Sequence, residues 1–89
     1  MKDLVIIGAG YGFWETNELI RDINEREPKY RVVALLDDNT ETHGRVIDGV
    51  SVAGGTDKAI NYPDAGFVFC IGSKDTRDKR KSIIDRIGI

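Results

Sequence analysis

Several residue types are scarce in this chain, and each shortage narrows the chemistry it can perform. Among 89 residues there is one cysteine and one histidine. A single cysteine excludes an internal disulfide framework and any zinc site built on cysteines. Cys70 lies in an apolar run, so we expect a small buried side chain there and not a nucleophile. His43 lies in a polar stretch, and nothing in the sequence pairs it with Cys70 for catalysis.

Excess charge and long apolar runs are also missing. The 13 lysines and arginines nearly balance 15 aspartates and glutamates, which leaves a formal net charge of −2. This balance predicts no nucleic-acid partner and no membrane-surface partner. No apolar run approaches the roughly 18 residues of a membrane-spanning helix, and the first residues do not resemble a signal peptide. We therefore expect a single cytoplasmic domain that occupies residues 1–89.

Apolar runs and helical periodicity alternate along the chain. Strands are expected at 4–7, 30–36 and 67–71 with a short edge strand at 50–52, and helices at 13–27, 57–61 and 74–87. Residues 40–48 are polar and are expected to form a loop, and Thr56 is expected to cap the second helix. Strands that alternate with helices favour right-handed crossovers and a parallel sheet. The prediction is a three-layer, Rossmann-like α/β domain with about four strands in the order 3-2-1-4.

The first helix has one predicted apolar face. That face consists of Phe13, Thr16, Leu19, Ile20 and Ile23. Trp14 falls beside it, and we expect it to pack there or to form a subunit contact. Pro28 is expected to end the helix.

A glycine-rich turn follows the first predicted strand. Gly8, Gly10 and Gly12, with Tyr11 between the last two, lie between a strand and a helix. In this context glycines permit a tight turn and let an anion approach the N–H groups at the helix N-terminus. The third glycine of the dinucleotide pattern G-x-G-x-x-G would fall at position 13, where this chain has phenylalanine. The alternative is that the glycines only form a tight turn.

Two further segments follow predicted strands. Asp37 ends the second strand, and an acid there can accept hydrogen bonds from ribose hydroxyls. Asp38 could contact a base edge or cap the next turn. Gly54-Gly55 could form another wall of the same cleft.

After the last predicted strand, Gly72 permits close approach of a ligand and Ser73 can donate a hydrogen bond. Lys74 or Arg77 can offset phosphate charge. The alternative for these residues is a capped helix with solvated side chains.

Five stretches along the chain form a pattern that is specific in combination. They are Leu4-Val5-Ile6-Ile7-Gly8-Ala9-Gly10, Glu18-Leu19-Ile20, Leu35-Leu36-Asp37-Asp38-Asn39, Gly44-x-x-Ile47-Asp48-Gly49-Val50-x-Val52-x-Gly54, and Phe69-x-Ile71-Gly72 with Arg77 five residues later. Together they resemble the N-terminal domain of bacterial hexapeptide-repeat sugar acetyltransferases of the sialic-acid O-acetyltransferase and bacillosamine N-acetyltransferase type. That family usually continues Gly-Ala-Gly with Gly-His and a lysine two residues later, which this chain lacks.

The resemblance implies a function for the domain. In that family the N-terminal domain binds a nucleotide-linked amino sugar, typically a UDP-sugar. A following left-handed β-helix binds acetyl-CoA, forms the trimer and carries the catalytic histidine. Residue by residue, Gly8, Gly10, Tyr11 and Gly12 would approach the diphosphate, Asp37 and Asp38 would contact the nucleoside, and Gly72, Ser73 and Arg77 would border the nucleotide-sugar. This chain has no hexapeptide repeat, so we expect it to bind substrate and not to catalyse by itself, with no cofactor in this domain.

Two other functions remain open at this stage. One is an NAD-binding or other nucleotide-binding Rossmann half of a reductase or regulator, which Phe13 disfavours. The other is a standalone interaction module, with Phe13 and Trp14 at a dimer surface.

Overall fold

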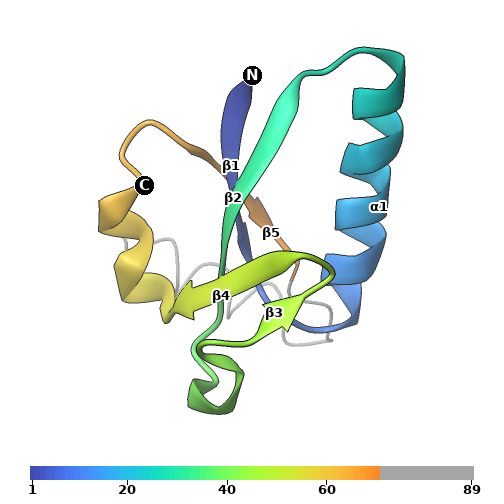
Figure 1. Ribbon diagram of the computed structural model, residues 1–89. Helices are drawn as coiled ribbons and strands as arrows, with labels where there is room; N and C mark the ends of the chain where they lie inside the picture. Colours follow the sequence, from blue (N-terminus) through green and yellow to red (C-terminus); the bar gives the residue numbers. More distant parts are fainter. Residues whose placement is uncertain (71–89) are drawn as a thin grey trace.

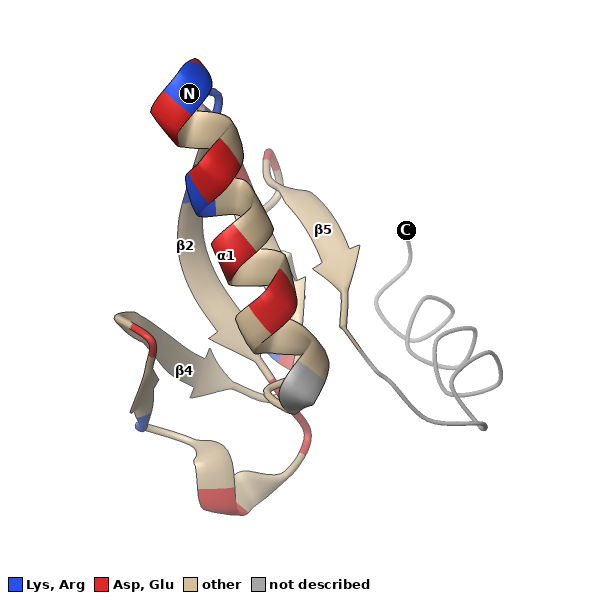
Figure 2. Ribbon diagram, turned by 90° about the vertical axis from the view of Figure 1, so that its right-hand side faces the viewer, with Lys and Arg blue, Asp and Glu red and all other residues tan. Residues whose placement is uncertain are grey.

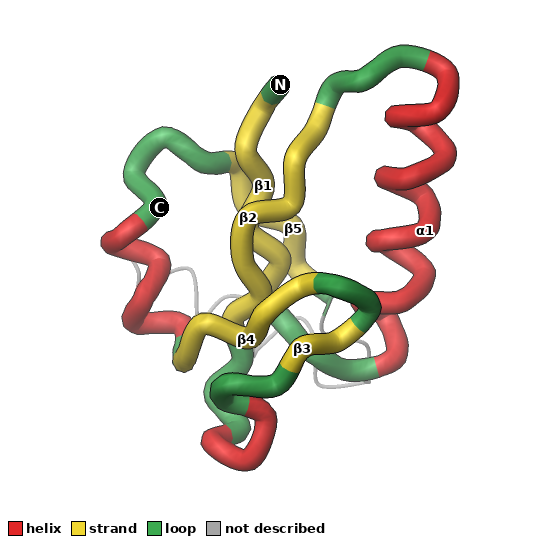
Figure 3. Tube along the Cα trace, viewed as in Figure 1, coloured by secondary structure: helices red, strands yellow, loops and turns green. Residues whose placement is uncertain are grey.

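A computed structural model describes residues 1–70 of the chain, with the exception of the Tyr11 side chain. The predicted helix at 74–87 and the site residues Gly72, Ser73 and Arg77 lie outside the described residues. The elements in chain order are β1 (Lys2–Ile7), α1 (Tyr11–Arg26), β2 (Tyr30–Leu36), η1 (Thr40–Thr42), β3 (Val46–Ile47), β4 (Val50–Gly54), η2 (Thr56–Asn61) and β5 (Gly66–Phe69), where η denotes a 3-10 helix. Figures 1 and 3 show their arrangement.

The five strands form one sheet in the order β3-β4-β2-β1-β5. β1 pairs in parallel with β2 and β5, and β2 pairs in parallel with β4. The predicted order 3-2-1-4 is therefore confirmed for the four main strands. β3 adds a short antiparallel strand outside β4, so the predicted edge strand is not at the edge.

β1 is an interior strand between β2 and β5 and is buried on both faces, which explains its unbroken apolar sequence. Leu4 and Ile6 point toward α1, whereas Val5 and Ile7 point to the opposite face. The α1 side of the core also contains Phe13, Ile20, Leu35, Val52 and Cys70. The opposite side is covered by η2 through Ala59, with Tyr62 and Ala65 packed beside it. Helical segments therefore lie on both faces of the sheet (Figure 1).

The apolar face of α1 is narrower than predicted. Phe13 is fully buried and Ile20 nearly so, but Leu19 is 59% exposed. Asn17 is buried in place of Leu19 because it lies closer to the line that joins Phe13 and Ile20 on the helix surface. The predicted role of Leu19 in the core is wrong. Figure 2 shows acidic residues along the solvent face of α1.

Three other local predictions are wrong. The helix begins at Tyr11, two residues earlier than expected. Thr56 is the first residue of η2 and not its cap, since Gly55 is the N-cap and supplies no side chain. Residues 46–47 form a strand within the segment expected to be a loop.

Candidate functional site

Four segments meet at the carboxyl edge of the sheet. The Gly8 N–H donates to the Leu36 carbonyl at 2.8 Å, and the Asp37 N–H donates to the Gly54 carbonyl at 2.9 Å. The Cys70 N–H donates to the Ile7 carbonyl at 2.7 Å. These bonds continue the strand ladders past their ends. They bring the turns after β1, β2 and β4 together with Cys70 at the end of β5, at the edge where ligands bind in open α/β sheets.

The fold requires glycine at two of the three glycine positions in the turn after β1, for different physical reasons. Gly8 has φ of 111°, a conformation that favours glycine. A Cβ on Gly12 would lie 3.0 Å from the Cys70 carbonyl oxygen, so Gly12 permits close packing of α1 against the end of β5. Phe13, in turn, fits fully inside the core.

Neither backbone conformation nor close packing requires glycine at position 10. Its φ of −85° suits any residue, and a Cβ there would meet no atom within 4 Å among the described residues. Gly10 is exposed and is the N-cap of α1, and no side chain accepts a hydrogen bond in that cap. The first helical turn, which Tyr11 opens, contains no acidic residue. Open space above Gly10 therefore adjoins the electropositive end of a helix.

Asp37 connects three segments of this edge. Its carboxylate accepts from the Ala9 N–H at 2.7 Å through Oδ2 and from the Asn39 N–H at 2.8 Å through Oδ1. Its own N–H donates to Gly54, as described above. Asp37 thus fixes the glycine-rich turn relative to the end of β2.

Asp38 acts on the opposite wall. Its Oδ1 accepts from the Thr56 N–H at 2.9 Å and from the Thr56 hydroxyl at 3.0 Å. A Cβ on Gly55 would lie 3.1 Å from the same oxygen. Asp38 therefore holds the start of η2 and replaces the cap that was predicted for Thr56. The two neighbouring carboxylates fasten opposite walls, and the structure brings Gly54-Gly55 to the predicted cleft edge.

His43 also lies at this edge, although its sequence gave no sign of it. The ring is exposed, and its Nε2 lies 2.7 Å from the Asp37 carbonyl oxygen. Asn39 caps η1 through its side chain, and the Gly44 N–H donates to the Val52 carbonyl at 3.0 Å. These bonds hold the segment that carries His43 against β4.

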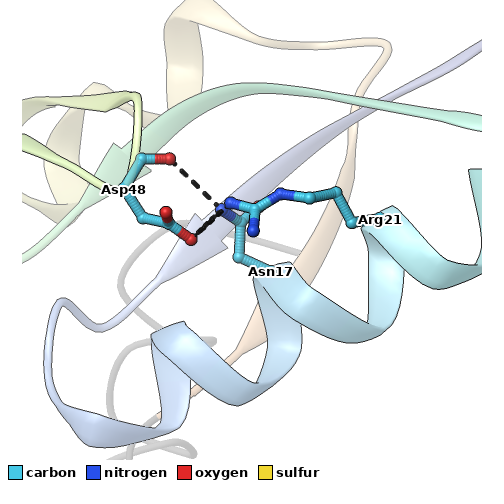
Figure 4. Close-up of polar contacts among 3 residues, drawn as sticks. All are labelled: Asn17, Arg21 and Asp48. Carbon is cyan, nitrogen blue, oxygen red and sulfur yellow. Dashed lines mark hydrogen bonds and ion pairs between the residues drawn. The ribbon is translucent and has the colours of Figure 1, made fainter.

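Asp48 is a second polar residue that the sequence analysis did not single out. Its Oδ2 accepts from the Asn17 amide at 2.9 Å and from Arg21 at 2.5 Å (Figure 4). The Asn17 hydrogen bond, and then the Arg21 guanidinium, lower the pKa of Asp48 although partial burial opposes them. This contact, the Asp48 clip, joins the β3–β4 hairpin to α1.

Cys70 is buried as predicted, with 7% exposure. Its thiol lies 3.1 Å from the Thr16 hydroxyl, and burial raises the pKa of Cys70. Trp14 is 51% exposed and makes an edge contact with Phe13. Within residues 1–70, no three histidine, cysteine, aspartate or glutamate side chains lie close enough together to hold a metal ion. In the same part of the chain, no helix combines the length and hydropathy needed to cross a bilayer.

Comparisons with known proteins give a family match and a similar solved structure. Residues 3–86 match the sequence model of the family described as the PglD N-terminal domain. No curated protein gives a significant match. One similar solved structure is titled "Crystal structure of RSP in complex with beta-NADH", with a TM-score of 0.65 and 19% sequence identity. The match covers all of this chain and 43% of that one, and at this identity it shows a shared Rossmann-like fold.

Proposed function

Because the chain belongs to the PglD N-terminal domain family, we propose that it binds a UDP-linked amino sugar. It would serve as the substrate domain of an acetyl-CoA-dependent sugar N- or O-acetyltransferase. A β-helix domain outside this chain would bind acetyl-CoA, form a homotrimer and carry the catalytic residues. The setting would be cytoplasmic glycan biosynthesis. The chain itself would bind and orient substrate without catalysing the transfer.

The observation that supports this proposal most directly is the space at Gly10. Neither backbone conformation nor packing against the described residues calls for glycine at this position. A diphosphate could approach the backbone there and accept hydrogen bonds from N–H groups at the start of α1, including those of Tyr11 and Gly12. The Ala9 N–H is not among them, since Asp37 already accepts it.

We propose that the nucleoside binds beside Gly10, at the end of β2. Asp37 and Asp38 fix the turns on either side of the β2 end, so the expected nucleoside contact would lie between positions that are already held in place. Gly72, Ser73 and Arg77 follow β5 in the sequence, and we propose that they border the sugar diphosphate. Arg77 would supply positive charge that offsets the charge of the diphosphate.

Calorimetry with UDP, UDP-sugars, CMP-sugars and NAD tests the proposal. We expect UDP and at least one UDP-amino sugar to bind more tightly than CMP-sugars or NAD. Tighter binding of NAD would favour a dinucleotide-binding function, for which the shared fold alone gives no support. The absence of any nucleotide binding at millimolar concentration would contradict the proposal.

A further inference from the structure

The hydrogen bond made by His43 determines which nitrogen of its ring carries a proton. Nε2 lies 2.7 Å from the Asp37 carbonyl oxygen, and a carbonyl oxygen can only accept. Nε2 must therefore be the N–H nitrogen, and in the neutral ring Nδ1 keeps a lone pair. Within residues 1–70, no side chain or backbone group is hydrogen-bonded to Nδ1. His43 thus presents an oriented acceptor on the exposed surface of the edge.

The nearby carboxylates are used differently. Both oxygens of Asp37 accept backbone N–H groups, and both oxygens of Asp38 lie within hydrogen-bond distance of the Thr56 hydroxyl. These bonds hold the walls of the site together. A hydrogen-bond acceptor for a ligand at the end of β2 is therefore better supplied by a side chain that does not already accept these internal hydrogen bonds.

The position of His43 is also fixed before any ligand arrives. Its backbone N–H donates to the Thr40 carbonyl at 3.2 Å, and the following Gly44 N–H donates to β4. With the ring bonded to Asp37, the backbone and the side chain are both held. Little ordering would be needed for Nδ1 to accept a hydrogen bond from a bound molecule.

We propose that His43 is a specificity-determining residue that accepts a hydrogen bond from the nucleoside, either from a ribose hydroxyl or from a base N–H. The inference rests on the proposed function and assigns the nucleoside end of the site. It goes beyond the diphosphate seat at Gly10. Asp37 then acts as a positioning residue that orients both the turn and the His43 ring.

Nitrogen NMR of the unaltered chain provides the first test, since it needs no substitution. At alkaline pH, the free protein should show His43 as the Nε2–H tautomer. Added UDP should shift the Nδ1 resonance as its lone pair accepts a hydrogen bond, whereas inorganic pyrophosphate should leave it in place. An Nδ1–H tautomer, or an Nδ1 resonance that UDP does not move while UDP binds, would overturn the inference.

Calorimetry of variants provides the second test. His43→Phe should weaken UDP binding about fivefold, the scale of one neutral hydrogen bond, and leave pyrophosphate binding unchanged. His43→Gln should recover part of the loss, because its amide can donate at one atom and accept at the other. Thr40→Ala, a change at an exposed side chain of the same segment, should keep the affinity of the original chain.

The outcomes separate the two proposals. Equal UDP affinity in His43→Phe and the original chain would overturn the role of His43 and leave the proposed function standing. Equal weakening of UDP and pyrophosphate would also overturn it, because the effect would then not lie at the nucleoside. If the original chain binds neither molecule, the proposed function has failed, and the assignment of His43 fails with it.

Discussion

At the scale of single residues, the fold requires glycine at two of the three glycine positions after β1. Gly8 has positive φ, and Gly12 faces the carbonyl of Cys70. Gly10 has an ordinary conformation and open space. The glycines look alike in the sequence, so their spacing could predict the turn but could not separate the two that the fold requires from Gly10, which it does not.

This difference predicts how two alanine variants behave. Gly8→Ala should lower the free energy of unfolding by about 1–3 kcal/mol, because alanine is strained at φ of 111°. Gly10→Ala should leave stability nearly unchanged and weaken UDP binding, since its methyl group would enter the proposed diphosphate seat. Urea denaturation and calorimetry measure the two effects. A Gly10→Ala variant that binds UDP normally would remove Gly10 from the site.

Asp37, Asp38 and His43 illustrate the limit of sequence reasoning at the same scale. An acid after a parallel strand is predicted to lie at the carboxyl edge of the sheet, and both acids lie there. The sequence does not show that their carboxylates accept the N–H groups of Ala9 and Thr56, because those partners are 28 and 18 residues away. The sequence likewise does not place the His43 ring at this edge, because its partner there is a main-chain carbonyl, which every residue type has.

At the scale of elements, the β3–β4 hairpin is the main feature absent from the prediction. Asp48 and Gly49 form its two-residue turn, with φ of 49° and 81°. Positive φ at both positions is what a type I′ turn requires, and Asp-Gly is among its preferred pairs. That dipeptide was therefore an available signal. β3 has only two residues, which are too few to show the alternation of apolar and polar side chains that marks a strand.

The Asp48 clip predicts a pH-dependent contribution to stability. Asp48→Asn keeps a residue that tolerates positive φ but removes the charge that faces Arg21. The folded pKa lies below the ordinary value of 3.8, so the carboxylate stabilises the fold above that pH. The contribution is lost as the pH falls through the folded pKa. Thermal melts should show a less stable variant at pH 7 and converging stabilities below about pH 3.8.

A matched control is available on the sheet. Asp3 and Arg31 form an exposed ion pair between β1 and β2 at 2.8 Å. Asp3→Asn should change stability by less than about 1 kcal/mol, as is usual for exposed pairs. If Asp48→Asn is no more destabilising at pH 7 than this control, the clip does not hold the hairpin to α1.

At the scale of the whole molecule, the sheet order was predictable because short crossovers between parallel strands permit few topologies. The alternation of Leu4 and Ile6 with Val5 and Ile7 then divides the core between two faces. How the second face would be covered was less evident, because η2 is a 3-10 helix with little periodicity of its own.

The only thiol of the chain gives a measurement of this global packing. Cys70 is buried on the α1 face where Gly12 approaches β5, and its pKa is raised by burial. A thiol reagent should therefore modify the native chain slowly, and should label one thiol per chain at once in denaturant.

If exposure of Cys70 requires global unfolding, UDP at 100 times its Kd should slow modification about 100-fold, because ligand stabilises only the folded state. Free cysteine under the same conditions controls for direct effects on the reagent. A rate that UDP does not change, although UDP binds, would show that Cys70 is exposed by local opening at the end of β5.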